Sequence, residues 1–212
     1  MKHAMSLAPA RSAVLAVLLA ATAALAVVLI AVTPKPADAE SRIITRSFSN
    51  GNEILIPDDG AADPYPSKIV ASFPKGSTVR DVNVVLRDYT HTWPDDVDVL
   101  LLHRGSKRTI MSDVGGSNAI ENLTIKLDDE ASTPLTDDGT LTGGTFKPTN
   151  QEGIDNFPDP APSGSASAEL SGAFDGLYAN GGWKLFVFDD AGPDSGDFDD
   201  GWTVRIKAKV PQ

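Results

Sequence analysis

Aspartates gathered in short clusters are the residues of this sequence whose type and spacing best suit chemistry. Calcium takes roughly six to eight oxygen ligands, and closely spaced carboxylates with loop carbonyls supply them. Asp96 and Asp98 lie two residues apart, so in an extended segment their side chains share one face. Asp189 and Asp190 form a second cluster at the end of an apolar segment. We therefore predict a calcium site formed by Asp96, Asp98, Asp189 and Asp190.

The alternative is that the same aspartates bind no metal and only shape turns. Aspartate is common in turns because its side chain accepts hydrogen bonds from nearby backbone N–H groups. Asp96 or Asp189 would then serve only to shape a buried loop. Zinc is a poor candidate, since the chain has no cysteine and only two histidines beyond residue 39.

Those two histidines, His91 and His103, also limit the catalytic options. A serine protease needs a nucleophile, a histidine base and an orienting carboxylate. His91 precedes an apolar strand-like segment, where we expect a hydrogen-bonded structural role, and we expect His103 to end a strand in solvent. Because the sequence also lacks a Gly-x-Ser-x-Gly nucleophile motif, we predict that the chain is not an enzyme.

The three tryptophans suggest a second kind of binding site. Trp183 and Trp202 each begin a segment with alternating apolar residues, so we predict that both are buried on adjacent antiparallel strands. Trp93 lies between Thr92 and Pro94 in a loop-like segment and is the best candidate for an exposed ring. Exposed aromatic rings stack on sugars in carbohydrate-binding modules, so Trp93 is a candidate ligand-binding residue, with burial in the core as the alternative.

Short period-two segments are the elements that must position these side chains. Trp202, Val204 and Ile206 alternate with polar residues, as in a half-buried antiparallel strand. Gly, Pro, Asp and Asn separate such segments, which predicts an all-β antiparallel sandwich of the jelly-roll type. The expected strands are 42–48, 54–56, 68–73, 82–87, 97–102, 109–111, 123–127, 183–188 and 202–210.

A proline- and serine-rich segment at 151–168 interrupts this pattern. Loops of this length in a compact domain are usually functional or mobile. Because the segment contains the apolar residues Ile154 and Phe157, we expect an ordered crossover loop.

The first 39 residues have the pattern of a secretory signal peptide. Two basic residues precede an apolar run at 13–32, and Ala37 and Ala39 provide small residues for cleavage between Ala39 and Glu40. The run is also long enough to span a bilayer of about 30 Å, so an uncleaved anchor is the alternative. In both cases residues 40–212, the predicted domain, are secreted or held on the outer side of the membrane.

Charge narrows the range of partners. The whole chain carries −11, and because residues 1–39 hold three basic residues and one acidic residue, residues 40–212 carry −13. Such a surface repels phosphate backbones, which argues against nucleic-acid binding. It is compatible with divalent cations or a basic partner.

Several short motifs resemble those of the P domain of subtilisin-like proprotein convertases. His91-Thr92-Trp93-Pro94-Asp95-Asp96-Val97-Asp98-Val99 resembles the family's His-Thr-aromatic-x-x-Asp-Leu-x-apolar segment, and Asn180-Gly181-Gly182-Trp183-Lys184-Leu185 resembles its Asn-Gly-x-Trp-x-Leu strand start. Further pieces follow in the family's order, so the resemblance runs from Ile54 to Ile206. They lie at 56–58, 112–116, 127–131, 144–148, 187–190, 194–196 and 201–204.

The resemblance implies a galactose-binding-domain-like jelly roll with an accessory role. In the convertases this domain follows a subtilisin-like catalytic domain and stabilises it, whereas here it stands alone. The sequence departs from the family at Leu102-His103-Arg104-Gly105, where relatives have Ser-Pro-x-Gly, and the insertion before Glu169 resembles the larger bacterial form. The expected function is a secreted, non-catalytic, calcium-stabilised module. The alternatives are a stabilising subunit or relative of a subtilisin-like serine endopeptidase, and an extracellular carbohydrate-binding module. The expected partner is a secreted protease or a cell-surface protein.

Overall fold

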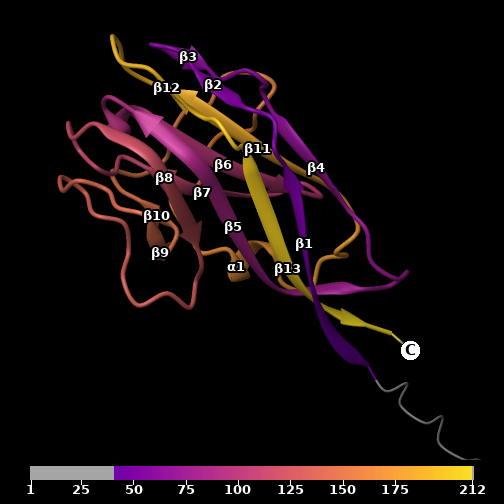
Figure 1. Ribbon diagram of the computed structural model, residues 1–212. Helices are drawn as coiled ribbons and strands as arrows, with labels where there is room; N and C mark the ends of the chain where they lie inside the picture. Colours follow the sequence, from indigo (N-terminus) through magenta and orange to yellow (C-terminus); the bar gives the residue numbers. More distant parts are fainter. Residues whose placement is uncertain (1–40, 212) are drawn as a thin grey trace, which may run out of the picture. The chain divides into compact units, whose positions relative to one another are not determined.

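A computed structural model describes residues 41–211, and the predicted signal peptide with its Ala39–Glu40 cleavage site lies outside these residues. Within the described range the chain forms thirteen strands, one short helix, α1 (Ser171–Phe174), and one 3₁₀ turn at Pro94–Asp96. Figure 1 shows the strands arranged as a sandwich. The prediction of an all-β sandwich is therefore confirmed. No helix in this range has the length and apolarity needed to cross a membrane.

The first sheet contains seven strands in the order β1-β13-β5-β12-β2, and β8 pairs with β5 and β9. The antiparallel β1–β13 pairing runs without interruption over nine residues of each strand. The bounds are β1 (Arg42–Asn50), β2 (Ile54–Ile56), β5 (Thr78–His91), β8 (Ile120–Leu127), β9 (Gly144–Phe146), β12 (Gly196–Phe198) and β13 (Trp202–Val210).

The second sheet contains six strands in the order β10-β7-β6-β11-β3, and β4 also pairs with β11. β11 is central, since it pairs with β6 on one side and with β4 and β3 on the other. The bounds are β3 (Gly60–Ala61), β4 (Ser67–Ala71), β6 (Val97–His103), β7 (Ser106–Ser112), β10 (Thr149–Asn150) and β11 (Gly181–Asp189).

Two short pairings depart from the otherwise antiparallel pattern of the sandwich. β8 pairs with β9 in parallel, and so does β7 with β10. Parallel neighbours need a crossover that returns the chain to the end where the first strand began. The connection at 128–143 makes this return before β9.

The core lies between the sheets, where alternate residues of the strands meet. Trp183 and Trp202 are both fully buried there, but Trp183 belongs to β11 of the second sheet and Trp202 to β13 of the first, so they are not on adjacent strands as predicted. The Trp202 indole N–H donates to Ser67 Oγ on β4, 2.9 Å away, and so links the two sheets. Period-two patterns show which face of a strand is buried, but they do not assign the strand to a sheet.

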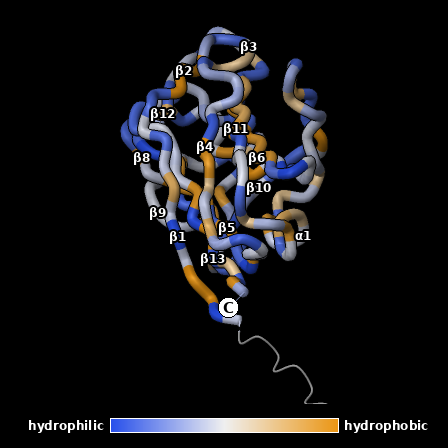
Figure 2. The backbone as a smooth tube through the Cα atoms, turned by 90° about the vertical axis from the view of Figure 1, so that its right-hand side faces the viewer, coloured by the Kyte–Doolittle hydropathy of each residue, from blue (hydrophilic) through white to orange (hydrophobic). Residues whose placement is uncertain are grey.

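Segment 151–168 covers the outer face of the second sheet. Phe157 and Ala161 of this segment pack against Leu100 and Phe186 and form a second apolar cluster outside the main core. Phe157 is 8% exposed, whereas Ile154 is 63% exposed. In Figure 2 apolar stretches follow the strands of the interior, while the connecting loops are mostly hydrophilic.

Candidate metal site

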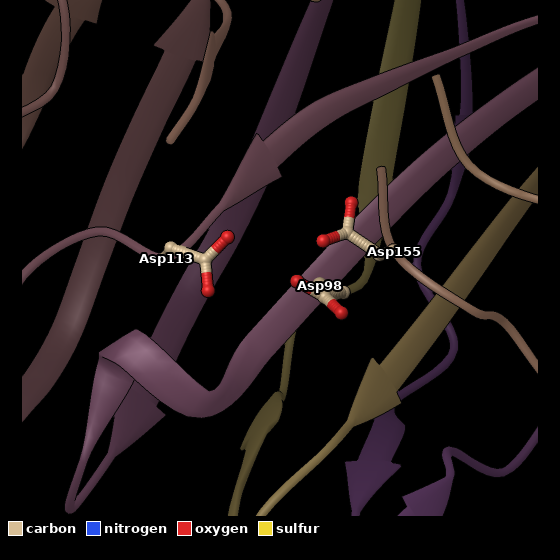
Figure 3. Close-up of side chains that lie close together, drawn as sticks. All are labelled: Asp98, Asp113 and Asp155. Atoms are coloured by element: carbon tan, nitrogen blue, oxygen red, sulfur yellow. The ribbon is translucent and has the colours of Figure 1, made fainter. Parts of the chain in front are cut away.

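Three aspartates from separate parts of the chain meet above the second sheet. Asp98 lies in β6, Asp113 directly follows β7, and Asp155 belongs to segment 151–168. One carboxylate oxygen from each residue lies within 4.8 Å of the other two. Figure 3 shows the three side chains around a common space. This spacing would let one cation contact all three.

Strand register decides where Asp98 points. Asp98 pairs with Phe188 of β11, and paired residues in neighbouring strands project to the same face of a sheet. Phe188 packs against the second apolar cluster, so Asp98 also projects to the outer face, under segment 151–168. Asp98 is only 2% exposed as a result.

The other two aspartates are positioned by local backbone structure. Asp113 ends β7 with a φ of 51°, a left-handed conformation that aspartate tolerates better than most residues. The segment carrying Asp155 is tied to β7 by two reciprocal hydrogen bonds. Thr109 N–H donates to Ser165 Oγ at 2.9 Å, and Ser165 N–H donates to Thr109 Oγ1 at 3.0 Å.

The cluster brings several carboxylates together in a buried environment, where the charged form of each is disfavoured. Burial, reinforced by the neighbouring carboxylates of Asp155, Asp190 and Asp113, raises the pKa of Asp98 to about 8. Burial likewise raises the pKa of Asp113 to about 6. The Ser112 hydroxyl donates to Asp113 Oδ2 at 2.8 Å and opposes these shifts. In residues 41–211 no lysine or arginine forms an ion pair with the three carboxylates.

A cavity of about 400 Å³ opens over the cluster and supplies further oxygen atoms. Its lining includes Glu152, Asn156 and Asp190 in addition to the three aspartates. Asp155 Oδ2 is buried and accepts no hydrogen bond from the described residues. Together these side chains offer enough oxygen ligands for a calcium ion.

Only two of the four aspartates expected to bind calcium line the cavity. Asp98 and Asp190 line the same cavity. Asp189 instead pairs with Val97, one register step from Asp98, and successive strand residues point to opposite faces. Asp189 is therefore buried between the sheets, away from the cavity.

Asp96 departs from the predicted geometry for a different reason. It lies in the 3₁₀ turn at Pro94–Asp96, so Asp96 and Asp98 are not part of one extended segment. Within residues 41–211 the only group of three or more potential metal-binding side chains within ligand distance is Asp98, Asp113 and Asp155. The expected convergence of Asp96, Asp98 and Asp189 is thus not found.

Sequence reasoning did not select Asp113 or Asp155 as ligands. Asp113 carried a usable signal, because it follows an apolar strand in Ser112-Asp113-Val114-Gly115-Gly116 and resembles a family motif. Asp155 is isolated in the loop at 151–168, where no pattern indicates which way it points.

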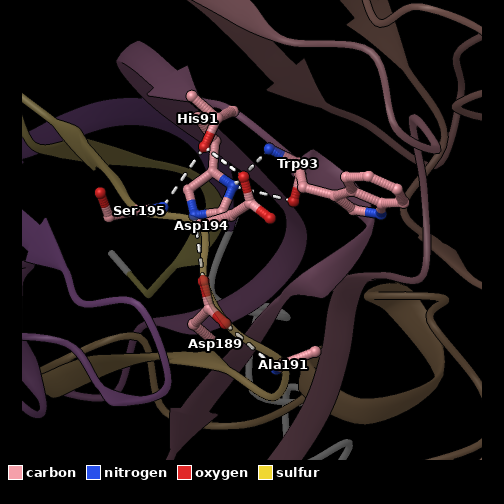
Figure 4. Close-up of polar contacts among 7 residues, drawn as sticks. His91, Trp93, Asp189, Ala191, Asp194 and Ser195 are labelled. Carbon is pink, nitrogen blue, oxygen red and sulfur yellow. Dashed lines mark hydrogen bonds and ion pairs between the residues drawn. The ribbon is translucent and has the colours of Figure 1, made fainter.

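His91 and Asp189 form a separate buried pair, drawn in Figure 4. His91 Nε2 lies 3.1 Å from Asp189 Oδ2, and both side chains are fully buried. His91 Nδ1 lies 2.8 Å from the carbonyl oxygen of Trp93, and Ala191 N–H donates to Asp189 Oδ1 at 3.1 Å. Burial lowers the pKa of His91 and raises that of Asp189 to about 7. Protein groups therefore lie beside both ring nitrogens, although the contact between Nε2 and Oδ2 does not have hydrogen-bond geometry.

His103 is not in solvent, which corrects the prediction. It is fully buried and stacks on Trp183, with ring centroids 3.9 Å apart. Its ring nitrogens lie 2.9 Å from the carbonyl oxygen of Gly182 and 2.8 Å from that of Tyr178. His103 pairs with Trp183 across β6 and β11, and the large indole covers the imidazole.

Trp93 differs from the other two tryptophans in its exposure. It is 42% exposed, whereas Trp183 and Trp202 are fully buried. Its neighbours Thr92 and Asp194 are joined by a hydrogen bond of 2.7 Å, which connects the loop after β5 to the loop after β11. The exposed ring is therefore carried by a braced loop.

Comparison with protein-family models finds no match for this chain. Searches against curated proteins and against solved structures find no significant match either.

Proposed function

We propose that this chain is an extracytoplasmic, non-catalytic accessory module of the P-domain type, stabilised by a calcium ion at Asp98, Asp113 and Asp155. One observation carries the proposal: the three carboxylates lie within one cation's reach around an almost completely buried Asp98. Folding these charges together without a counterion costs free energy. A bound cation would remove that cost.

Ligand chemistry favours calcium over the other common metals. Every side chain around the cavity that could coordinate a metal offers oxygen, which suits a hard cation. Zinc sites usually use cysteine or histidine, but the chain has no cysteine, and His91 and His103 are buried with partners of their own. Magnesium demands near-ideal octahedral geometry, whereas calcium accepts the irregular arrangement that a loop provides.

Calcium would act as a clamp between three segments. Its ligands would come from a strand, from the end of the next strand and from segment 151–168. The ion would therefore fix the segment that covers the second apolar cluster. A ligand that binds only the folded state stabilises it by RT ln(1 + [L]/Kd).

The buried histidines support the non-catalytic part of the proposal. A general base must reach the proton that it abstracts, and neither His91 nor His103 is accessible to a substrate. The resemblance to P domains supplies the accessory role, with a secreted subtilisin-like protease or a cell-surface protein as partner. Labelling the purified protein with a serine-protease probe should give no signal, and labelling abolished by one serine substitution would contradict this part.

Thermal unfolding tests the calcium site. Extracellular calcium modules have Kd values of about 10⁻⁴–10⁻³ M, so about 10 mM calcium should add more than ~1 kcal/mol of stability. The melting temperature should rise by several degrees relative to chelator. Asp155→Asn should remove most of this rise, while Asp200→Asn, an exposed control in a turn, should keep it. Equal melting temperatures with calcium and with chelator would overturn the proposal.

A carbohydrate-binding role is the second candidate, favoured by the exposed Trp93 ring. Aromatic faces at protein surfaces supply rigid apolar contact area. A glycan array should then show binding that Trp93→Ala abolishes without lowering the melting temperature. Binding that survives the substitution would place the sugar elsewhere.

A further inference from the structure

Basic residues collect at the end of the sandwich where the described chain begins and finishes. Two hollows of about 310 and 320 Å³ lie on either side of Gly76. Neither hollow is lined by an aspartate or glutamate. The first is lined by Ser41, Gly76, Thr78, Arg80, Lys209 and Pro211, and the second by Lys75, Gly76, Arg104, Tyr178 and Asn180. We call Lys75, Arg80, Arg104 and Lys209 the basic end.

Strand direction separates the basic end from the acidic cavity. β11 starts next to Asn180, which lines one basic hollow, and ends next to Asp190, which lines the acidic cavity. A nine-residue strand spans about 30 Å. The positive hollows and the acidic cavity therefore lie at opposite ends of the second sheet, in a chain whose net charge is −11.

The cations of the basic end are presented to solvent. Lys75, Arg80 and Arg104 are exposed, and Lys209 is half-buried. Asp175 interacts electrostatically with Arg80, so Lys75, Arg104 and Lys209 provide most of the net positive charge.

An exposed aromatic side chain accompanies these cations. Tyr178 is 57% exposed, and the Arg104 guanidinium carbon lies 5.4 Å from the centre of its ring. Arg104 is held in place by its Nη2, which donates to the carbonyl oxygen of Asn180 at 2.9 Å. Tyrosine and arginine both suit a membrane–water interface, because each combines an apolar body with a polar tip.

We propose that the basic end docks on an anionic lipid surface. The chain outside the described residues supports this choice of partner. Residues 13–32 form an uncharged apolar run of membrane-spanning length, and only eight residues separate it from Ser41, which lines the first hollow. Eight extended residues reach at most about 29 Å. When the run is kept as an uncleaved anchor, the membrane that holds it therefore lies within reach of the basic end.

Docking would orient the module as well as hold it. Each Lys or Arg close to an anionic surface strengthens binding roughly fivefold. With the basic end on the lipid, the cavity at Asp98 would face away from the membrane, toward calcium and partners. The attraction falls off over a Debye length, about 8 Å at physiological salt, so it requires close approach.

The experiment uses the full chain and the fact that it contains no cysteine. A single fluorophore is attached through Ser72→Cys, which follows β4 next to the basic end, or through Ser117→Cys in the loop between β7 and β8. Both serines are exposed. Each labelled chain is reconstituted into vesicles that carry a headgroup-bound quencher, made of phosphatidylcholine alone or with roughly 30 mol % phosphatidylglycerol, an anionic lipid.

Docking predicts that only the Ser72→Cys probe is quenched more strongly in the anionic vesicles. About 0.5 M salt should abolish the difference. Lys75→Gln with Lys209→Gln should weaken docking by roughly twenty-five-fold. The matched pair Lys147→Gln with Lys184→Gln removes the same charge elsewhere and should leave quenching unchanged.

Three outcomes would overturn the proposal. Quenching of the Ser72→Cys probe could be independent of lipid charge. Both probes could respond equally, which would mean that the module has no fixed orientation. Quenching could instead follow protein density, which would identify the acidic end of a second copy as the partner of the basic end. None of these outcomes bears on the calcium site, whose test is carried out without lipid.

Discussion

Asp98 and Asp189 are both buried aspartates on neighbouring strands, one register step apart, and their surroundings are opposite in kind. Asp189 points between the sheets, where His91 Nε2 and the Ala191 N–H face its two oxygens. Asp98 points to the outer face, where its neighbours are the carboxylates of Asp113 and Asp155. Asp189 thus has a histidine and a backbone N–H beside its oxygens, whereas Asp98 has two other carboxylates within ligand distance.

The difference bears on which of the two carboxylates is a candidate for binding a cation. Burying a charge is costly unless it is paired and hydrogen-bonded. Asp189 has a protein neighbour at each oxygen, His91 Nε2 and the Ala191 N–H, but burial still raises its pKa to about 7. Asp98 instead has the carboxylates of Asp113 and Asp155 within ligand distance, which makes it the candidate cation ligand of the two. Substitutions at the two aspartates and at their neighbours test this difference.

Removing the partner of Asp189 should have the largest effect. His91→Ala removes the neighbour of Asp189 Oδ2 and leaves a cavity in the core, and the two effects together should cost about 3–5 kcal/mol. Denaturant unfolding should show a loss of this size, whereas Asp200→Ala at an exposed turn should change stability by less than about 0.5 kcal/mol. An unchanged midpoint for His91→Ala would mean that the pair contributes nothing.

Removing the charge of Asp98 should raise the stability of the metal-free protein, whereas His91→Ala lowers it. Asp98→Asn removes a buried charge that its neighbours repel, so in chelator the melting temperature should rise by several degrees at about pH 8. The same substitution should abolish the response to calcium. A lower melting temperature in chelator would show that the protein already compensates the charge of Asp98.

Acidity should modulate the calcium effect. The raised pKa values of Asp98, about 8, and Asp113, about 6, mean that the folded metal-free protein binds protons more tightly than the unfolded chain. Its stability from these groups is therefore greatest below their ordinary pKa of 3.8 and is lost as pH rises toward 8. Calcium needs the deprotonated carboxylates. The calcium-induced rise in melting temperature should be larger at about pH 8 than at about pH 5.5, and a rise independent of pH would contradict the site.

Trp93 should give the smallest effect on stability. Trp93→Ala removes a partly exposed ring and should change the free energy of unfolding by about 0.5 kcal/mol or less. Trp183→Ala is the matched contrast, because a fully buried tryptophan should cost about 3–5 kcal/mol. Similar losses for the two variants would show that Trp93 belongs to the core and is not free to bind a ligand.

The alternation of apolar residues made the fold class predictable. β13 and β11 were visible because alternate residues such as Val204 and Ile206 must face one core. The sheet to which each strand belongs was not visible, since Trp183 and Trp202 have equivalent local patterns. The short parallel strands β9 and β10 also lacked a pattern, because three and two residues show no period.

The candidate site was only half predictable for similar reasons. Asp98 and Asp190, which line one cavity, could be selected because clustered carboxylates at strand ends are a local signal. The opposite orientation of Asp189 depends on the β6–β11 register, and the contribution of Asp155 depends on how a long loop folds back. Both are tertiary facts that no local motif records. The burial of His103 likewise depends on Trp183 in the strand beside it.

The antiparallel pairing of β1 with β13 places the first and last described residues at one end, since Ser41 and Pro211 line the same hollow. Any sequence joined to either terminus would therefore leave the module on one side. Affinity tags, fluorescent proteins or a second domain could be fused there without covering the opposite pole. The module can therefore be attached through the end that holds both termini, while its opposite end stays accessible for measurement.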